Sequence, residues 1–186
     1  MNKGKLFVVS GPSGVGKGTI CSKILERVPN LKVSVSATTR APRTGDVEGE
    51  TYFFKSQEHF DAMIENEELL EWATYNGNRY GTPIWAVNDM LENGISVILE
   101  IDTQGALQVK EKMPESILIF IAPPTFDELA ARLKGRATES EEEIARRIAA
   151  AEGEMALQSE YHHVVINDDL DTAVDEAEKL FRGLKT

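Results

Sequence analysis

The stretch Leu6-Phe-Val-Val-Ser-Gly-Pro-Ser-Gly-Val-Gly-Lys17 decides the fold, because it joins a short apolar run to a glycine-rich segment. Residues 6–10 have the length and composition of a buried strand. Residues 11–17 match the pattern G-x-x-x-x-G-K, and residues 19–28 have the apolar spacing of a helix. In this context successive backbone N–H groups converge on phosphate oxygens, and the helix N-terminus adds its positive end. The stretch therefore predicts a phosphate loop.

The residue after Lys17 departs from this pattern. Gly18 stands where the motif carries a Ser or Thr whose hydroxyl binds magnesium directly, and Thr19 comes one position later. We therefore expect the metal to be held mainly by phosphates, water and a distant carboxylate, with Thr19 as the alternative ligand. Lys17 itself is placed to reach the β- and γ-phosphates.

The rest of the chain alternates apolar strands with amphipathic helices. Near-continuous apolar runs are typical of parallel strands that are covered on both faces. Strands are predicted at residues 95–102, 117–122 and 164–167, and helices at 84–92, 104–112 and 171–181, with further helices opened by capping boxes at Thr125 and Ser140. This order predicts an α/β fold with a parallel-sheet core covered by helices on both faces.

Two stretches interrupt this alternation. Residues 34–82 contain short segments of alternating polarity, at 34–36, at 50–54 and on either side of Asn76-Gly77, the strongest short signal for a β-hairpin. They predict a small β-rich insertion. Residues 133–143 contain a glycine, nearby arginines and dense glutamate, and we expect them to form an exposed, mobile segment.

The charge and composition of the chain exclude several partners. Its 186 residues carry 20 Lys and Arg against 31 Asp and Glu, which makes a net charge of −11. A mean field of this sign repels nucleic acid and anionic membranes. No apolar run reaches the length of a membrane span or a signal peptide, so the sequence predicts a cytoplasmic protein. The single cysteine, Cys21, supports neither a disulfide framework nor a zinc cluster, and we expect a buried, inert thiol.

A predicted strand that ends in two acidic residues points to a further part of the site. Glu100 and Asp102 lie at i and i+2, hence on one face of the strand. Two carboxylates at the tip of a buried strand are unfavourable without a cation or donors nearby, and ligands bind at this edge of α/β sheets. The pattern therefore favours a role for both carboxylates in binding the substrate and, through water, magnesium. The alternative is that Asp102 only caps the following helix.

Arginines form two groups in this acidic chain. Arg40 and Arg43 are joined by a stiff proline link, and both guanidinium groups could bind one phosphate. The second group surrounds residues 133–143 and comprises Arg132, Arg136, Arg146 and Arg147. Surface charge is the simpler explanation for each residue alone. Two such groups together with a phosphate loop favour phosphoryl transfer, which needs charge neutralised on several oxygens at once.

Taken together, these residues resemble the guanylate kinases, a family of ATP:GMP phosphotransferases, from about Gly4 to Phe181. Beside the phosphate loop, S-G-P-S-G-V-G-K, the matching motifs are S-x-T-T-R-x-P-R-x-G at 36–45, G-E-T-Y-F-F at 49–54, E-W-A at 71–73, N-R-Y-G-T at 78–82, E-I-D-x-Q-G at 100–105, G-R-x-T-E at 135–139 and I-N-D-D at 166–169. Together they are highly specific. The resemblance implies transfer of the γ-phosphoryl group of ATP to GMP, and also dGMP, to give ADP and GDP in purine nucleotide metabolism with Mg²⁺ as cofactor.

The resemblance also implies a domain organisation. A single domain would comprise a core of residues 1–33, 83–125 and 148–186, a GMP-binding insertion at 34–82 and a mobile lid at 126–147. Its partners would be the small substrates ATP and GMP, with no nucleic acid and no membrane, and the choice between a monomer and a homodimer stays open.

Roles for individual residues follow from the same resemblance. The residues implied at ATP are Gly11, Pro12, Ser13, Gly14, Val15, Gly16, Lys17, Gly18 and Thr19 at the phosphates and Asn167 near the adenine. Those implied at GMP are Arg40, Arg43, Tyr52 and Tyr80 at the phosphate, Ser36, Glu71 and Thr82 at the base, and also Glu100 and Asp102. The implied catalytic cations are Lys17, Arg40, Arg132, Arg136 and Arg147. Glu100 stands where some relatives have Asp, and Ala137 replaces a common glycine of the lid.

The chemistry of Glu71 agrees with a guanine site. Guanine presents N1–H and an exocyclic amine side by side, and one carboxylate can accept from both, whereas adenine presents an acceptor at N1. A site that leaves polar groups mispaired rejects the wrong base more strongly than shape does. Without the motif, Glu71 would be explained as a solvated charge on an edge strand.

The expected reaction needs no general base, because the GMP phosphate is already anionic at neutral pH. The sequence accordingly contains no His/Asp or Ser/His nucleophilic arrangement, and we expect its three histidines, His59, His162 and His163, at the surface or at strand edges. Catalysis is expected to combine positioning with magnesium and arginine stabilisation of a largely dissociative transition state. Closing of residues 34–82 and of the lid would exclude water.

Three alternatives remain open at this point. A kinase for another monophosphate, such as adenylate or thymidylate, is disfavoured by Glu71. A non-catalytic guanylate-kinase-like module that binds proteins is disfavoured by the presence of Lys17, Arg40 and Arg43. A regulatory GTPase is disfavoured because no N-K-x-D signature follows the loop.

Overall fold

The computed structural model describes residues 3–134 and 140–183. The chain divides into two compact units. Unit 1 comprises Met1–Leu6, Asn30–Leu99 and Leu107–Ser116, and unit 2 comprises Phe7–Pro29, Glu100–Ala106 and Ile117–Thr186. Among the described residues, no helix has both the length and the apolar character that a membrane span requires.

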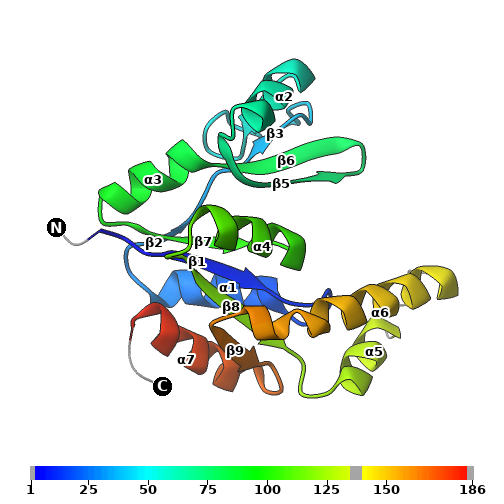
Figure 1. Ribbon diagram of the computed structural model, residues 1–186. Coiled ribbons are helices and arrows are strands. Elements are labelled where there is room, and N and C mark those ends of the chain that lie inside the picture. The colour runs from blue at the N-terminus through cyan, green and yellow to red at the C-terminus, as the bar shows by residue number, and fades with distance from the viewer. Residues whose placement is uncertain (1–2, 135–139, 184–186) are drawn as a thin grey trace. The chain divides into compact units, whose positions relative to one another are not determined.

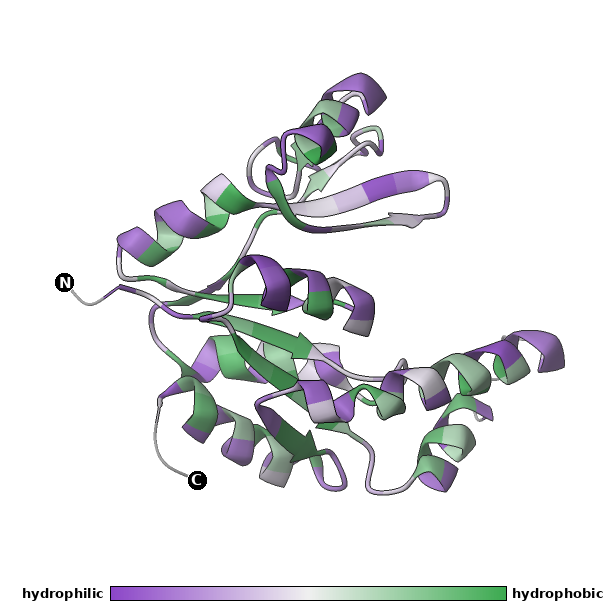
Figure 2. Cartoon of the chain, in the orientation of Figure 1, coloured by the Kyte–Doolittle hydropathy of each residue, from purple (hydrophilic) through white to green (hydrophobic). Residues whose placement is uncertain are grey.

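Parallel strands form the centre of unit 2. Strand β1 (Leu6–Ser10) pairs with β8 (Ile117–Ala122), and β8 pairs with β9 (His163–Ile166), all in parallel. All of β1 and all of β8 after its first residue are buried, and Figure 2 shows these strands in the hydrophobic colour. The predicted strands at 6–10 and 117–122 are confirmed to the residue, and the third, at 164–167, is displaced by one position.

Helices make up most of the rest of unit 2. They are α1 (Lys17–Arg27), α5 (Phe126–Lys134), α6 (Glu141–Ala156), the 3₁₀ turn η1 (Gln158–Glu160) and α7 (Leu170–Phe181). Helices α1 and α7 pack together, and the rings of Phe7 on β1 and Phe181 on α7 lie 4.4 Å apart. Cys21 on α1 is buried, as expected, and burial raises the pKa of its thiol to about 12. It is therefore a poor nucleophile.

Two further parallel strands lie in unit 1. Strand β2 (Leu31–Val33) pairs with β7 (Ser96–Glu100), with Leu31 opposite Ser96. The parallel sheet has the strand order β2-β7-β1-β8-β9. Helix α4 (Thr103–Lys112) follows β7 in the chain, and Figure 1 labels both elements. The predicted α/β class with a helix-flanked parallel sheet is confirmed. Strand β2 was not predicted, because only three residues of it pair.

A second sheet in unit 1 has the order β4-β3-β6-β5. Its members are β3 (Ala37–Thr38), β4 (Phe53–Phe54), β5 (Leu69–Tyr75) and β6 (Asn78–Pro83), and β6 continues into α3 (Ile84–Glu92). The predicted hairpin is confirmed: Asn76 and Gly77 join antiparallel β5 and β6 with φ values of 47° and 75°. Two positive φ angles in a two-residue turn match the right-handed twist of the paired strands.

The structure corrects the sequence analysis between residues 34 and 66. Helix α2 (Gln57–Glu65) was not predicted. The segment expected at 34–36 is not a strand, since the strand there is at 37–38, and the segment expected at 50–54 is a strand only at 53–54. The Ser56 side chain caps α2 by accepting from the His59 N–H, and Phe60 and Met63 are buried in a small cluster with Leu69. The helix is short and polar on its outer face, so its stability depends on this tertiary cluster rather than on a strong periodic pattern.

The structure also corrects part of the segment expected to be exposed and mobile. Leu133 and Lys134 belong to α5, and Leu133 is fully buried. Ser140 caps α6 in a capping box with Glu143, as predicted. The central part of the prediction, residues 135–139, lies outside the described residues.

Candidate functional site

The phosphate loop of unit 2 depends on glycine for its conformation. Gly14 and Gly16 adopt φ values of 86° and 97°, a region that other residues rarely occupy. A Cβ atom on Gly16 would lie only 2.6 Å from the side-chain nitrogen of Asn167. Helix α1 begins immediately afterwards, at Lys17, so its N-terminus and the loop N–H groups belong to one continuous segment.

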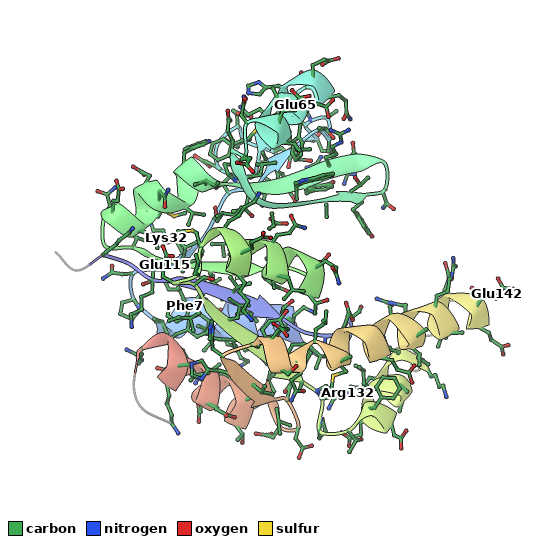
Figure 3. All side chains as sticks on the ribbon, in the orientation of Figure 1. Phe7, Lys32, Glu65, Glu115, Arg132 and Glu142 are labelled. Atoms are coloured by element: carbon green, nitrogen blue, oxygen red, sulfur yellow. The ribbon has the colours of Figure 1, made fainter. Side chains whose placement is uncertain are left out.

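Asn167 supports this loop. It follows β9, it is buried, and its Nδ2 donates to the Val15 carbonyl over 2.7 Å. Its own carbonyl accepts two 3.3 Å hydrogen bonds from the guanidinium of Arg132 on α5, which Figure 3 labels. The structure thus brings Asn167 and Arg132 to the loop, and it shows a supporting contact for Asn167 that the sequence did not suggest.

Lys17 folds back over its own loop. Its ammonium donates to the carbonyls of Gly11 at 2.5 Å and Pro12 at 3.1 Å. Burial lowers the pKa of Lys17, and the carboxylates of Glu154 and Glu100 oppose that effect. The partners in both hydrogen bonds are uncharged backbone carbonyls, so these contacts do not neutralise the ammonium group.

Helix α6 reaches the loop at Ser13. The Arg147 guanidinium donates to the Ser13 hydroxyl over 2.9 Å. The Glu154 carboxylate accepts from the Ser13 backbone N–H over 3.3 Å. Arg147 was a candidate from the sequence, whereas Glu154 was missed, because nothing in its local pattern distinguishes it from the other glutamates of the chain.

A pocket of about 300 Å³ lies against the loop in unit 2. It is lined by Ser13, Gly14, Gly16, Lys17, Gly18, Thr19 and Glu100. The carboxylate of Glu100 is so close to Gly18 that a Cβ atom there would lie 3.5 Å from it. The pocket therefore combines loop donors, an ammonium group, a hydroxyl and a carboxylate.

Asp102 has a structural partner of its own. Its Oδ1 accepts from the Gly105 N–H over 2.7 Å, at the start of α4, which is the capping role considered as the alternative in the sequence. Asp102 also lines a pocket of about 370 Å³ together with Glu154. Within the described part of the chain, no cluster of three or more His, Cys, Asp or Glu side chains is arranged to hold a metal ion.

The candidate residues of unit 1 include a guanidinium surrounded by aromatic rings. The Cζ atom of Arg40 lies 5.2 Å from the centre of the Tyr52 ring and 5.8 Å from that of Phe54. The rings of Tyr52 and Tyr80 meet edge-on, with centres 5.9 Å apart. The structure thus brings Arg40, Tyr52 and Tyr80 together, from three separate segments of unit 1.

Asp46, which the sequence analysis missed, organises the arginines. Its Oδ2 accepts from Arg40 Nη2 over 2.9 Å and from the Arg43 backbone N–H over 2.7 Å. The hydrogen bond from the Arg43 backbone has the larger effect, and together with the bond from Arg40 it holds the pKa of Asp46 below its usual range. The side chain of Arg43 itself is exposed.

A buried carboxylate lies between β5 and β6. Glu71 and Thr82 are 7% and 2% exposed, and the Thr82 hydroxyl donates to Glu71 Oε1 over 2.6 Å. Gly81 makes this approach possible, because a Cβ atom there would lie 2.9 Å from the Glu71 carbonyl oxygen. The burial of Glu71 excludes the explanation as a solvated edge charge.

The remaining candidates have the following positions. Ser36 is half-buried just before β3, and its carbonyl accepts from the Phe53 N–H over 2.9 Å. Gln108, which the sequence analysis missed, accepts from the Trp72 N–H over 3.2 Å, next to Glu71. Arg136 lies outside the described residues. His59, His162 and His163 are exposed, as expected.

The chain matches known proteins over almost its whole length. The family model for guanylate kinase matches residues 3–183. A guanylate kinase of Halalkalibacterium halodurans is 54% identical over 93% of this chain and 85% of that protein, and one of Caldanaerobacter subterraneus is 55% identical over 94% and 84%.

Solved structures agree with these matches. The crystal structure of guanylate kinase from Anaplasma phagocytophilum has a TM-score of 0.71 and 34% identity, and the match covers 98% of this chain and 86% of that one. A shikimate kinase from Bacteroides thetaiotaomicron, at a TM-score of 0.51 and 14% identity over 96% and 98% of the two chains, shares the fold alone. The family model, the relatives and the first of these structures lead to one conclusion: this chain belongs to the guanylate kinase family of transferases.

Proposed function

We propose that the chain transfers the γ-phosphoryl group of ATP to GMP, and also to dGMP, giving ADP and GDP. The observation that carries this assignment is the buried Glu71 carboxylate hydrogen-bonded to Thr82. A buried carboxylate needs donors, and guanine offers two adjacent N–H groups, whereas adenine would place an acceptor against it. The phosphate loop in unit 2 supports the second substrate, ATP.

We assign ATP to the ATP half-site, which consists of residues 11–19 with Arg132, Arg147 and Asn167. Loop N–H groups and the start of α1 would hold the phosphates, as helix N-termini do. Lys17, released from the carbonyls of Gly11 and Pro12, would bind phosphate oxygens. Arg147 donates to the Ser13 hydroxyl of the loop at 2.9 Å, and Arg132 donates at 3.3 Å to the carbonyl of Asn167, which supports the loop. Both guanidinium groups would neutralise the transferring group.

We assign GMP to the GMP half-site, which consists of Ser36, Arg40, Arg43, Tyr52, Glu71, Tyr80 and Thr82. Arg40, held among aromatic rings, would bind the phosphate with Arg43 and the two tyrosine hydroxyls. Glu71, Thr82 and Ser36 would read the base. An arginine that is already positioned loses less side-chain entropy when the anion binds.

The residues at the loop fit a magnesium ion that is bound together with the nucleotide. Mg²⁺ commonly keeps several waters and is held by one or two carboxylates plus substrate phosphates, so it does not need an all-protein cluster. Glu100 and Thr19 line the pocket at the loop and are the proposed contacts, with Asp102 acting through water. The ion, when bound, neutralises charge on the phosphates.

No side chain needs to act as a general base, because the accepting phosphate of GMP is already an anion. The protein's part is to bring the two phosphates into line, to neutralise charge with Lys17, Arg40, Arg132, Arg136 and Arg147, and to exclude water. We propose that residues 34–82 and the lid, residues 126–147, close over the substrates on a core of residues 1–33, 83–125 and 148–186. A cytoplasmic location, and a monomer or homodimer, remain predictions from the sequence.

The test is an assay of ADP release from ATP with GMP, dGMP, AMP, dTMP and UMP supplied in parallel. We expect turnover with GMP and dGMP and little with the other acceptors, because only guanine satisfies Glu71. Turnover with AMP instead would indicate another monophosphate kinase. No turnover with any acceptor would indicate a binding module.

A further inference from the structure

The phosphate loop carries an anion that belongs to the protein itself. Glu154 lies on α6, and its Oε2 accepts from the Ser13 backbone N–H over 3.3 Å. Backbone N–H groups of such loops are the donors that bind phosphate oxygens. A carboxylate of the protein therefore bonds to one of the donors that the loop offers to an anion.

Glu154 shares one face of α6 with a buried residue and with a second side chain that bonds to the loop. Arg147, Ala151 and Glu154 are spaced i, i+4 and i+7, so they share one face of the helix. Ala151 is fully buried, and Arg147 donates to the Ser13 hydroxyl over 2.9 Å. The same residue of the loop is thus bonded at its N–H and at its hydroxyl by two side chains of one helix.

Glu154 has charged neighbours of both signs. Its carboxylate is partly buried, and burial raises its pKa, while the ammonium of Lys17 lowers it. The Asp102 carboxylate lines the same pocket and raises the pKa of Glu154. The Ser13 N–H thus binds a carboxylate that shares its pocket with a second carboxylate.

We propose that Glu154 is a resident anion that competes with nucleotide phosphates for the loop, so that it lowers the affinity for ATP and ADP and couples occupancy of the loop to the position of α6. The proposal rests on the assignment of ATP to this loop. A phosphate that takes the Ser13 N–H must displace the carboxylate, since two anions cannot share one donor at close range without repulsion. Displacement breaks the bond between Glu154 and Ser13 and so removes a contact of α6 with the loop.

Substitution of Glu154 should change the affinity for nucleotide in the opposite direction from substitution of a residue that only supports the loop. Loss of a residue that only supports the loop would weaken nucleotide binding. Loss of a competitor strengthens it. We expect Glu154→Gln to bind ADP and inorganic tripolyphosphate about tenfold more tightly, the factor that corresponds to one hydrogen bond to a charged group.

The experiment is isothermal titration calorimetry of the full chain with ADP and, separately, with tripolyphosphate. The variants are Glu154→Gln and Glu154→Ala, and the matched control is Glu152→Gln, an exposed glutamate of the same helix. Binding of GMP, assigned to unit 1, is titrated in each variant as a measure of correct folding. Both Glu154 variants should gain affinity for both ligands, and Glu152→Gln should bind as the wild type does.

The outcomes distinguish this proposal from the proposed function. If the wild type binds ADP and the Glu154 variants bind it equally or more weakly, the competition is wrong and the ATP half-site stands. A gain with ADP but none with tripolyphosphate would also overturn it, because the competition would then not concern the phosphates. If the wild type binds neither ligand, the assignment of ATP to the loop fails, and the proposal fails with it.

Discussion

The ATP half-site and the GMP half-site bind anions by different means. The first relies on consecutive backbone N–H groups, whose geometry comes from glycines with positive φ in one short segment. The second relies on side chains from separated segments, in which Arg40 lies beside Tyr52 and the β5–β6 hairpin joins Glu71 to Thr82. A local site depends on backbone conformation, whereas a dispersed one depends on strand register and packing.

The two half-sites also share a feature. In each, a carboxylate of the protein bonds to groups assigned to phosphate: Glu154 at Ser13 and Asp46 at Arg40. The carboxylates differ in their surroundings. Burial raises the pKa of Glu154, whereas hydrogen bonds lower that of Asp46. The comparison suggests that Glu154 is the more easily displaced of the two, because its charged form is the less stabilised.

The largest expected effect comes from removing the cation of the ATP half-site. Lys17→Ala should lower kcat by about 10²–10³-fold, the cost of losing a preorganised group that stabilises transition-state charge. The affinity for GMP should not change, because Lys17 belongs to unit 2. Steady-state rates and GMP titration test this, with Lys23→Ala on the same helix as the control. Weaker GMP binding would show that the two half-sites are not independent.

Removing the charge of Glu71, the carboxylate proposed to read the base, should affect the GMP half-site alone. Glu71→Gln should lower kcat/KM for GMP about 10–100-fold, because a donor replaces an acceptor in a buried site. The affinity for ADP should stay at the wild-type value. Parallel GMP kinetics and ADP titration check this, with the exposed Glu65→Gln as the control. An unchanged rate with GMP would exclude Glu71 from reading the base.

A substitution where β5 and β6 approach closely tests whether the GMP half-site depends on the packing of these strands. Gly81→Ala would place its Cβ atom 2.9 Å from the Glu71 carbonyl oxygen. It should lower the free energy of unfolding by about 1–3 kcal/mol, as overpacking does, and weaken GMP binding. Urea unfolding measures this. The control is Gly153→Ala on α6, where no atom lies within 4 Å of the added Cβ and stability should rise. A neutral Gly81→Ala would mean that the hairpin adjusts freely.

The contribution of Asp46 should depend on pH. Because its folded pKa is depressed, it stabilises the fold above its unfolded pKa, and this stabilisation is lost as the pH falls through the folded value. The difference in unfolding midpoint between the wild type and Asp46→Asn should therefore be larger at about pH 7 than below about pH 4. Urea unfolding across this range checks it. A constant difference would mean that the charge of Asp46 contributes nothing.

The smallest effect is expected at Gly18, the residue that departs from the phosphate-loop motif. Gly18→Ser places a Cβ atom in ordinary contact with the Glu100 carboxylate, at 3.5 Å, and Ser is a better helix former than Gly. It should raise the free energy of unfolding by about 0.5 kcal/mol and leave turnover intact. Gly16→Ser, at φ 97°, should lower both. Thermal unfolding and the ADP-release assay compare the two variants, and a loss with Gly18→Ser would show that the loop excludes any side chain there.

Much of the fold could be predicted from the sequence because the signals are local. Strands at 6–10 and 117–122, the Asn76-Gly77 turn and the Ser140 capping box each depend on a few neighbouring residues, and all are confirmed. Helix α2 was missed because its apolar face is only a few residues wide, and its stability comes from contacts with the cluster around Leu69.

The candidate site divides in the same way. The residues of the loop could be named from one motif, and the resemblance named the side chains at GMP. Glu154, Asp46 and Gln108 could not be found, because each acts through a backbone group that is distant in sequence or through a turn whose geometry the sequence does not specify.

The sequence by itself determined the alternation of strands and helices, the glycine loop with its lysine, and the family to which these belong, because these properties reside in the order of neighbouring residues. Only the tertiary structure decided that Glu71 is buried against Thr82, that Asn167 supports the loop, and that Glu154 occupies a loop N–H. Those contacts join residues 11 to 152 positions apart, and folding of the whole chain is what brings them within hydrogen-bond distance.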